Sequence, residues 1–400
     1  MIRRSQIVGL LKLGLVVALM VIVFRSVQMD DAWTEVRGEQ ETVVLGRIVG
    51  DWNKPEVRFL PDREGAAEIT LRPGVHAEGT THVSPGFLWA LRNLDPFLFG
   101  LGAIAFFLSI VTAAARWWWL LRINELHVSF WQAQRFTWIG NFFNNFVPGG
   151  TGGDLIKALY IMKHAPGARL RALVSVGVDR VMGLASLALL GAIVVLFALD
   201  RFAELAVLIW AVLLCVVLVG VLAFSRRVRR MVHLDDLLNR LPGRISAVLK
   251  RVDSAIYFYR AHGFGMAVWV ILGMLNHVIS VTSVVLMGKA LSIPLPTLEY
   301  FVLIPIVNII SAFPIAPNGW GVGEFMFKHL FSTYGAVYAP NSSNPGELMG
   351  TMGVALSVLF RVHITLWSLL GGLFVLLEKD RVTQRDIERE TELEEMENRG

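Results

Sequence analysis

Long apolar segments alternate with short polar ones along most of the chain. About 20 apolar residues are enough for a helix to cross a bilayer, and shorter apolar stretches qualify where flanking residues reach the interface. The pattern therefore predicts an all-α polytopic membrane protein with about six full spans. These are Ile7–Phe24, Pro96–Ala115, Leu173–Leu199, Phe202–Phe224, Phe264–Met287 and Leu348–Leu377.

Two further apolar segments, Phe130–Met162 and Leu298–Phe331, are interrupted by glycine and proline. The first contains N-F-F-N-N-F-V-P-G-G-T-G-G-D at 141–154, and the second contains N-I-I-S-A-F-P-I-A-P-N-G-W-G-V-G-E at 308–324. Each interruption has an Asn, a Phe five residues later, a Pro, a glycine-rich turn and a final acid. Such residues are disfavoured in lipid, so we expect both stretches to be functional.

Composition agrees with a membrane protein. Of the 400 residues 54% are hydrophobic and 17% charged, too apolar for one soluble core. The net charge of +5 does not indicate nucleic-acid binding, because the basic residues cluster between apolar spans, as in cytoplasmic loops. The single cysteine, Cys215, excludes an intramolecular disulfide and a cysteine metal cluster.

The positive-inside tendency decides how the interrupted segments are interpreted. If each crossed the membrane once, the basic segments 163–171 and 225–262 would lie outside. If each dips in and returns, both basic segments and both termini are cytoplasmic. We therefore predict two re-entrant helical hairpins, the first entering from the cytoplasm and the second from outside. This is the arrangement of an inverted repeat with a binding site at the midplane.

Four regions follow from this topology. Residues 1–24 are an N-terminal membrane anchor, 25–86 an extracytoplasmic β-rich domain, 87–377 a transmembrane domain with the basic loop 225–262, and 378–400 a charged cytoplasmic tail. The β-rich insert has β-prone runs at Thr42–Val49, Val57–Leu60 and Glu68–Leu71. Its eleven acids against seven Lys and Arg, a net charge of −4, suit the outside. It is either a lid or docking module, or a structural spacer.

The interrupted segments offer polar chemistry at membrane depth. Their glycines allow sharp turns and close approach of a ligand to the backbone, and the helices that follow point amide groups at the turn. The alternative is that the glycines only permit close helix packing and that Asp154 and Glu324 only cap helices.

Charged residues inside the spans add to these candidates. Arg180 and Arg361 suit a lipid phosphate, or each neutralises an acid, Asp179 or Glu324, in a structural pair. Lys157 attracts an anionic headgroup or merely marks the cytoplasmic face. The candidate substrate-binding residues are Asn141, Asn145, Pro148, Gly149, Gly150, Gly152, Gly153, Asp154, Lys157, Asp179, Arg180, Asn308, Pro317, Gly319, Gly321, Gly323, Glu324 and Arg361.

The run Arg116–Trp119, followed by Arg122, has the composition of an interfacial belt. We interpret its tryptophans as membrane anchors and its arginines as cationic anchors at the end of the second span.

P-G-G-T-G-G-D followed by Lys157, V-D-R at 178–180 and P-N-G-W-G-V-G-E at 317–324 resemble the flippase-like transmembrane region of lysylphosphatidylglycerol synthase and its stand-alone relatives. The resemblance covers residues 90 to 377. It implies a lipid-translocating domain whose hairpins and buried charges handle phospholipid headgroups. The aminoacyl transferase domain of the synthase has no counterpart here, so we do not expect synthesis of lysylphosphatidylglycerol. The polar insert departs from the family pattern, which leaves the substrate open.

Our hypothesis is a non-enzymatic, multi-pass protein of the inner membrane that moves a polar or anionic lipid between leaflets. The hypothesis involves no cofactor and no metal, and membrane lipids are the partners. A lipid-modifying enzyme or a protein bound to the insert is a further partner to be considered, and the oligomeric state is open. The alternatives are a membrane-embedded transferase acting on a lipid carrier, for which no catalytic motif is present, or an accessory subunit of a lipid-synthesising enzyme.

Overall fold

The computed structural model of the protein is mostly α-helical. It divides into two compact units. Unit 1 comprises Met1–Ala105 and Val281–Ile364, and unit 2 comprises Phe106–Ser280 and Thr365–Gly400. The structure describes residues 20–37, 40–52, 54–76, 79–146, 152–164, 169–233, 259–312, 319–340 and 342–377, with a few single positions elsewhere. Most of the predicted first span, the centre of the basic loop and the tail after 377 lie outside these residues.

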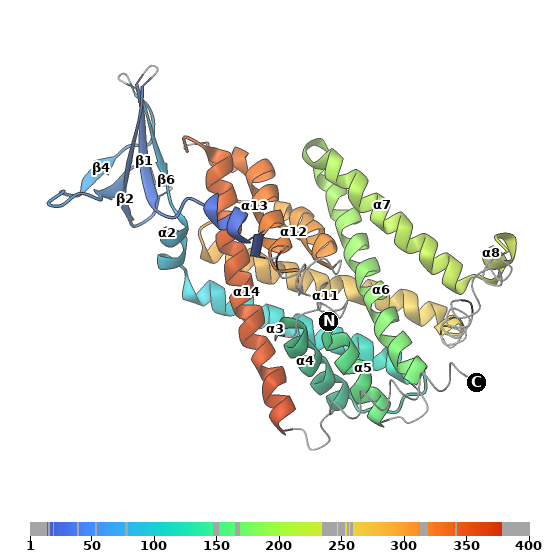
Figure 1. The fold of residues 1–400 in the computed structure, drawn as a ribbon. Helices are drawn as coiled ribbons and strands as arrows, with labels where there is room; N and C mark the ends of the chain where they lie inside the picture. Colours follow the sequence, from blue (N-terminus) through green and yellow to red (C-terminus); the bar gives the residue numbers. More distant parts are fainter. Residues whose placement is uncertain are drawn as a thin grey trace, which may run out of the picture. The chain divides into compact units, whose positions relative to one another are not determined.

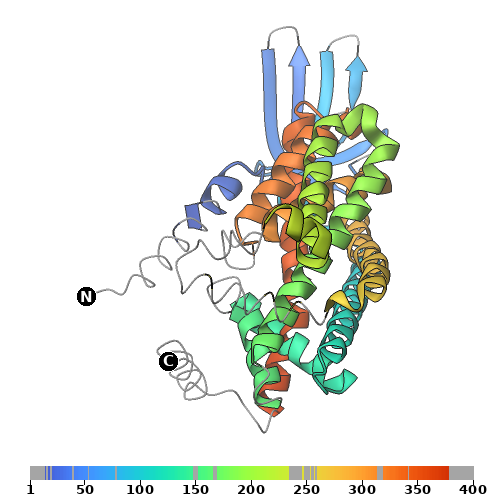
Figure 2. The same cartoon turned by 90° about the vertical axis from the view of Figure 1, so that its right-hand side faces the viewer.

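The polar insert forms one antiparallel sheet in the order β4-β3-β2-β1-β6-β5 (Figures 1 and 2). The predicted β-rich character of this segment is confirmed, and the three β-prone runs lie in or overlap β2, β3 and β4. The strands are β1 Asp31–Arg37, β2 Gln40–Val49, β3 Val57–Pro61, β4 Ile69–Leu71, β5 Gly74–His76 and β6 Gly79–Ser84.

The sheet is rolled. Its two edge strands, β4 and β5, are consecutive in the chain and separated only by residues 72 and 73, so the opposite edges must approach each other. The alternation of strand residues then separates an inner face from an outer one. Val57, Phe59 and Val83 are buried on one face, whereas Val43 and Leu45 are more than half exposed on the other.

Short polar contacts within unit 1 attach this sheet to its surroundings. The Asp31 carboxylate accepts hydrogen bonds from the backbone N–H groups of Ile48 and Gly86, both at 2.7 Å. The hydroxyl groups of Ser84 and Ser342 are 2.9 Å apart. Residue 342 lies just before α14 (Pro345–Leu377), so the end of β6 contacts the segment that leads into that helix.

Among the described residues, four helices are long and apolar enough to cross a membrane: Pro96–Ile123, Leu170–Phe224, Gly263–Ala290 and Pro345–Leu377. The second comprises α6 (Arg169–Val194), the 3-10 turn η1 (Val195–Ala198) and α7 (Leu199–Phe224). The chain reverses direction between α6 and α7 (Figure 1), as the two predicted spans with a short turn require. The others are α3, α11 and α14, and a short helix α8 (Arg226–Met231) follows α7.

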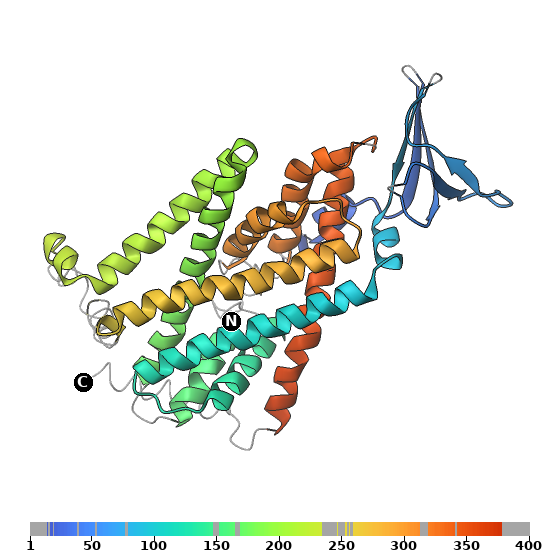
Figure 3. The ribbon, with the colours of Figure 1, turned by 180° about the vertical axis from the view of Figure 1, so that it is seen from behind.

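Helices α3 and α11 run antiparallel beside each other (Figure 3). In unit 1 the Ser283 hydroxyl donates to the Gly102 carbonyl oxygen at 2.7 Å. In unit 2 the Thr112 hydroxyl donates to the Asn276 side-chain oxygen at 2.6 Å. Buried and partly buried polar groups therefore pair across the two helices, as apolar surroundings require.

Both interrupted segments form pairs of short helices. The first is α4 (Phe130–Phe146) with α5 (Gly152–His164), and the second is α12 (Thr297–Ala312) with α13 (Val322–Gly335). The helices of the first pair have 17 and 13 residues and those of the second 16 and 14, each below the length of about 20 that a span needs.

Ring contacts show that each pair is antiparallel. Phe136 of α4 stacks on Tyr160 of α5 with centroids 5.1 Å apart, and Tyr300 of α12 lies 5.9 Å from Phe331 of α13. In both pairs a residue early in the first helix meets one late in the second, as a hairpin requires. Each hairpin belongs to a different unit, the first to unit 2 and the second to unit 1.

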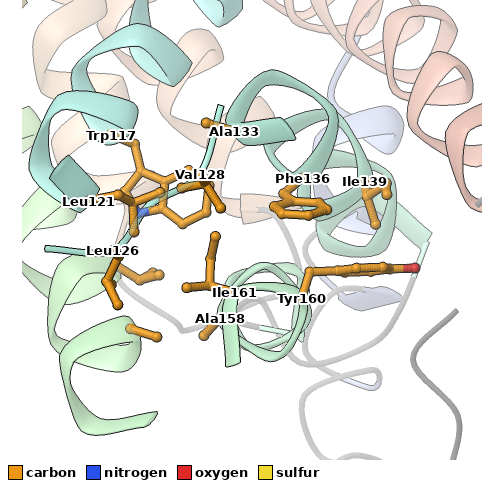
Figure 4. Close-up of a cluster of buried hydrophobic side chains, with 12 residues drawn as sticks. Trp117, Leu121, Leu126, Val128, Ala133, Phe136, Ile139, Ala158, Tyr160 and Ile161 are labelled. Carbon is orange, nitrogen blue, oxygen red and sulfur yellow. The ribbon is translucent and has the colours of Figure 1, made fainter. Parts of the chain in front are cut away.

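The first hairpin packs against the end of α3 and the start of α6 through a buried apolar cluster (Figure 4). Trp117 is completely buried at its centre, so the interpretation of this tryptophan as an interfacial anchor was wrong. Helix α3 continues to Ile123, two turns beyond the predicted end of the span, which places Trp117 inside the helix. The cluster comprises Trp117, Leu121, Leu126, Val128, Ala133, Phe136, Ile139, Ala158, Tyr160, Ile161, Ala172 and Val176.

Candidate functional site

In unit 1 the first turn of α13 is joined to the middle of α14 by a buried ion pair. Arg361 Nε donates to Glu324 Oε1 at 2.8 Å, and Arg361 Nη2 donates to the Gly319 carbonyl oxygen at 2.8 Å. The second oxygen of Glu324 accepts from the Gly321 backbone N–H at 2.6 Å. Glu324 is 1% and Arg361 9% exposed, so both charges are compensated within the protein.

The glycines of this turn make the ion pair possible. Gly319 and Gly321 have φ of +70° and +78°, a conformation that residues with a side chain rarely adopt. A Cβ atom at Gly323 would lie 2.8 Å from Arg361 Nη2, so a larger residue there would displace the guanidinium. The guanidinium also lies 5.1 Å from the Trp320 ring centroid, a cation–π contact.

In unit 2 the first turn of α5 makes a corresponding pair with α6. Arg180 Nε and Nη2 donate to the two oxygens of Asp154 at 2.9 and 2.8 Å, which is a bidentate arrangement. The Gly153 backbone N–H donates to the Asn144 side-chain oxygen at 2.9 Å, so α4 caps the helix that carries Asp154. Unlike the pair in unit 1, this one is accessible, because the Arg180 side chain is 61% exposed.

A second group of charges in unit 2 is buried. Arg116 Nε of α3 donates to Asp179 Oδ1 at 2.8 Å, and Lys157 Nζ lies 3.7 Å from Asp179 Oδ2. Lys157 Nζ is also 3.8 Å from the centroid of the Trp117 ring. We call Arg116, Lys157 and Asp179 the buried triad; they are 6%, 7% and 8% exposed.

The triad has two cations and one carboxylate, so its formal charge is +1. In addition, Arg116 Nη1 is buried and has no hydrogen-bond partner within the described part of the chain. This atom faces the backbone of α11, since a Cβ added at Gly273 would lie 3.3 Å from it. The neighbouring His277 of α11 contacts the Gly183 carbonyl oxygen at 3.0 Å through Nε2.

The two units therefore share one arrangement. In each, the acid in the first turn of the second hairpin helix pairs with an arginine on the next long helix: Glu324 with Arg361 and Asp154 with Arg180. Unit 2 has the buried triad in addition. The resemblance between the segments at 141–154 and 308–324 thus extends to the residues that their acids contact.

The structure assigns positions to most predicted site residues. Gly152, Gly153, Asp154, Lys157, Asp179 and Arg180 lie at the unit 2 clusters, and Gly319, Gly321, Gly323, Glu324 and Arg361 at the unit 1 pair. Asn145 instead donates to Thr365 Oγ1 at 3.2 Å and Ser368 Oγ at 3.3 Å on α14. Pro148, Gly149, Gly150 and Pro317 lie outside the described residues. Asn141 and Asn308 are partly buried on α4 and α12.

One predicted pairing is corrected. As a structural partner for Arg180 the sequence suggested its neighbour Asp179, but Arg180 pairs with Asp154 and Asp179 pairs with Arg116. Consecutive residues of a helix point about 100° apart, so two neighbours on α6 cannot face each other. The alternative in which Arg361 neutralises Glu324 is what the structure has.

Sequence reasoning missed Arg116 and Asn144. Arg116 was interpreted as an interfacial anchor because three tryptophans follow it. Asp179 was the available signal against this interpretation, because an acid deep in another apolar segment needs a basic partner. Asn144 was not among the candidate residues, although its neighbours Asn141 and Asn145 were. In the described chain no three His, Cys, Asp or Glu residues gather in a group that could hold a metal ion.

Comparison with known proteins agrees with a membrane protein. Residues 86–341 match the model of the family described as "Lysylphosphatidylglycerol synthase TM region". The chain is also similar to a UPF0104 membrane protein of Pyrococcus horikoshii, with 28% identity over 130 residues, which are 31% of this chain and 39% of that protein. The chain thus aligns with well under half the length of that relative. Because the family model covers more than half of the chain, the protein belongs to the lysylphosphatidylglycerol synthase transmembrane-region family.

Proposed function

We propose that the protein is a non-enzymatic, flippase-like transporter that moves a polar or anionic lipid between the leaflets of the cytoplasmic membrane. The observation that carries the proposal is the set of charged clusters at the hairpins. Charged groups are rare inside apolar helices and usually belong to a substrate or ion pathway. Membership of the family supports a role at lipid headgroups.

In this proposal the two hairpins are re-entrant. The helices of each hairpin are shorter than a span and antiparallel, which agrees with a segment that enters and leaves on one side. The Arg-rich loop 225–262 and both termini are then cytoplasmic. The first hairpin enters from the cytoplasm and the second from outside, as in an inverted-topology repeat.

The exposed pair Asp154–Arg180 is the part best suited to change partners. A bidentate guanidinium recognises a phosphate as well as a carboxylate, so a lipid phosphate can replace Asp154 on Arg180. Asp154 is then released to bind a cationic part of the headgroup, where the lipid has one. The Glu324–Arg361 pair has the same chemistry, but its burial makes exchange more costly.

Transport is tested with purified protein in proteoliposomes that contain an acyl-chain-labelled fluorescent lipid. A membrane-impermeant reductant bleaches the outer leaflet, and the extent of bleaching reports movement from the inner leaflet. We expect bleaching to exceed that of protein-free vesicles and to fall in Asp154→Ala and Glu324→Ala.

Glu204→Ala, which changes an exposed acid on α7, is the matched control and should retain transport. Unchanged transport in both hairpin variants overturns the residue assignment. If no lipid moves but a modified lipid accumulates with an activated donor, the protein is a transferase.

A further inference from the structure

We infer that the buried triad Arg116–Lys157–Asp179 binds one phosphodiester group, and that the preferred lipid therefore has a single net negative charge. This rests on the proposed function, because it takes a lipid headgroup as the source of the phosphodiester. It goes further in naming the charge class of the ligand and the residues that select it.

The first argument is electrostatic. All three residues are buried, with 6–8% of their surface exposed, and their formal charges sum to +1. A buried charge without a counter-ion costs several kcal/mol, so such a group is normally paired or hydrogen-bonded. The neighbouring charges Asp154 and Arg180 pair with each other, so this pair leaves the balance of the triad unchanged. One additional negative charge would make the cluster neutral.

The second argument is the unused hydrogen-bonding capacity of both cations. Arg116 Nη1 has no partner among the described residues. The Lys157 ammonium is 3.7 Å from Asp179 Oδ2, beyond hydrogen-bond length, so its contacts with Asp179 and the Trp117 ring are ionic and cation–π. Guanidinium and ammonium are the two groups that proteins most often present to phosphate.

The third argument is the contrast with unit 1. Glu324 and Arg361 are also buried, but their opposite charges cancel. Both Glu324 oxygens and two Arg361 nitrogens have partners within the protein. That pair has no excess charge to attract an ion. The unit 2 triad, in contrast to this pair, selects by charge: a zwitterionic headgroup leaves the +1 charge in place, and a dianion reverses its sign.

The test measures lipid binding to detergent-purified full-length protein by the shift of its thermal unfolding midpoint. The probes are dioctanoyl phosphatidylglycerol, with one negative charge, zwitterionic dioctanoyl phosphatidylcholine, and the water-soluble phosphodiester glycerophosphoglycerol. We expect the wild type to bind the phosphatidylglycerol at least about tenfold more tightly than either other probe, a difference of about 1.4 kcal/mol.

Lys157→Met neutralises the triad. It should remove this preference while leaving the unfolding midpoint without lipid unchanged or higher, because an uncompensated buried charge is gone. Lys163→Met, the same change at an exposed lysine of α5, should retain the preference. Arg116→Gln neutralises the triad from α3 and should reproduce the loss, which provides a second variant if Lys157→Met does not fold.

Equal binding of the two lipids by the wild type overturns the inference, as does unchanged phosphatidylglycerol affinity in Lys157→Met. Equal affinity for glycerophosphoglycerol assigns the site to a soluble phosphodiester and overturns the lipid source. Transport without preference for the anionic lipid overturns this inference and leaves the proposed function intact. Binding through Lys157 in a protein that moves no lipid supports the inference and overturns the proposed function.

Discussion

Glu324 and Arg361 lie 37 residues apart in sequence and form a buried ion pair in unit 1, with Nε and Oε1 2.8 Å apart. The pair links the first turn of α13 to the middle of α14, and Glu324 also accepts the Gly321 N–H, so one carboxylate fixes both the turn and the helix contact. Removing either charge leaves the other buried and uncompensated.

We therefore expect Glu324→Ala to lower the free energy of unfolding by about 3–5 kcal/mol, the usual cost of breaking a buried ion pair from one side. The measurement is denaturant unfolding of the detergent-purified protein. The double variant Glu324→Leu/Arg361→Met removes both charges and should regain most of this loss, because two apolar groups need no counter-charge. If the double variant is no more stable than Glu324→Ala, the loss of stability comes from the glycine turn that Glu324 holds and not from the uncompensated charge of Arg361.

Gly153→Ala should destabilise the first hairpin. A Cβ atom at this position would overlap the Gly140 carbonyl oxygen and lie 2.7 Å from the Asn144 side chain, so α4 and α5 would have to separate. Overpacking of this kind costs about 1–3 kcal/mol. Gly177→Ala on α6 is the matched control, since nothing lies within 4 Å of its added Cβ, and it should be neutral or stabilising. Equal unfolding midpoints for the two variants would contradict the close packing of the hairpin.

The hairpins could be located from sequence because their signal is local. Glycine, proline and an acid in an apolar segment are unusual wherever the chain folds, and the helix boundaries of α4–α5 and α12–α13 lie close to the predicted segments. The pairing of Glu324 with Arg361 was also foreseeable, because each is an isolated charge in apolar surroundings.

The triad was not foreseeable in the same way. Arg116 meets Asp179 across 63 residues of sequence, and its tryptophan neighbours suggested a membrane interface instead. Only the full length of α3, which continues to Ile123, shows that the arginine lies inside the helix. The direction in which the Arg180 side chain points depends on how α6 is rotated about its own axis. An almost uniformly apolar sequence does not specify this rotation.

Arg180→Gln should affect transport much more than stability. The Arg180 side chain is 61% exposed, and exposed ion pairs contribute roughly 0–1 kcal/mol. We expect the free energy of unfolding to fall by less than about 1 kcal/mol, while lipid movement in proteoliposomes is largely lost. Both quantities are measured on one preparation, with Arg122→Gln, an exposed arginine at the end of α3, as the control. A loss of stability as large as that of Glu324→Ala would show that the pair is structural.

The Asp31 carboxyl gives the sheet a pH dependence. It is 4% exposed, and burial raises its pKa above the ordinary 3.8, with Asp30 adding to the shift. Hydrogen bonds from the Gly86 and Ile48 backbone N–H groups and the charge of Arg92 oppose this shift without cancelling it. The folded sheet therefore holds the Asp31 proton more tightly than the unfolded chain does.

The sign of the effect follows from linkage. Between pH 3.8 and the raised pKa the folded state binds more protons, so this stabilisation is fully present below pH 3.8 and is lost as pH rises through the folded pKa.

Asp31→Asn removes the titration and keeps one side-chain acceptor. We expect the stability of wild type relative to Asp31→Asn to rise as pH falls through this window. Hydrogen–deuterium exchange of the β2 amides, corrected for intrinsic rates at each pH, measures the difference. A difference that instead grows as pH rises would mean that the two amide bonds outweigh burial and hold Asp31 as the carboxylate.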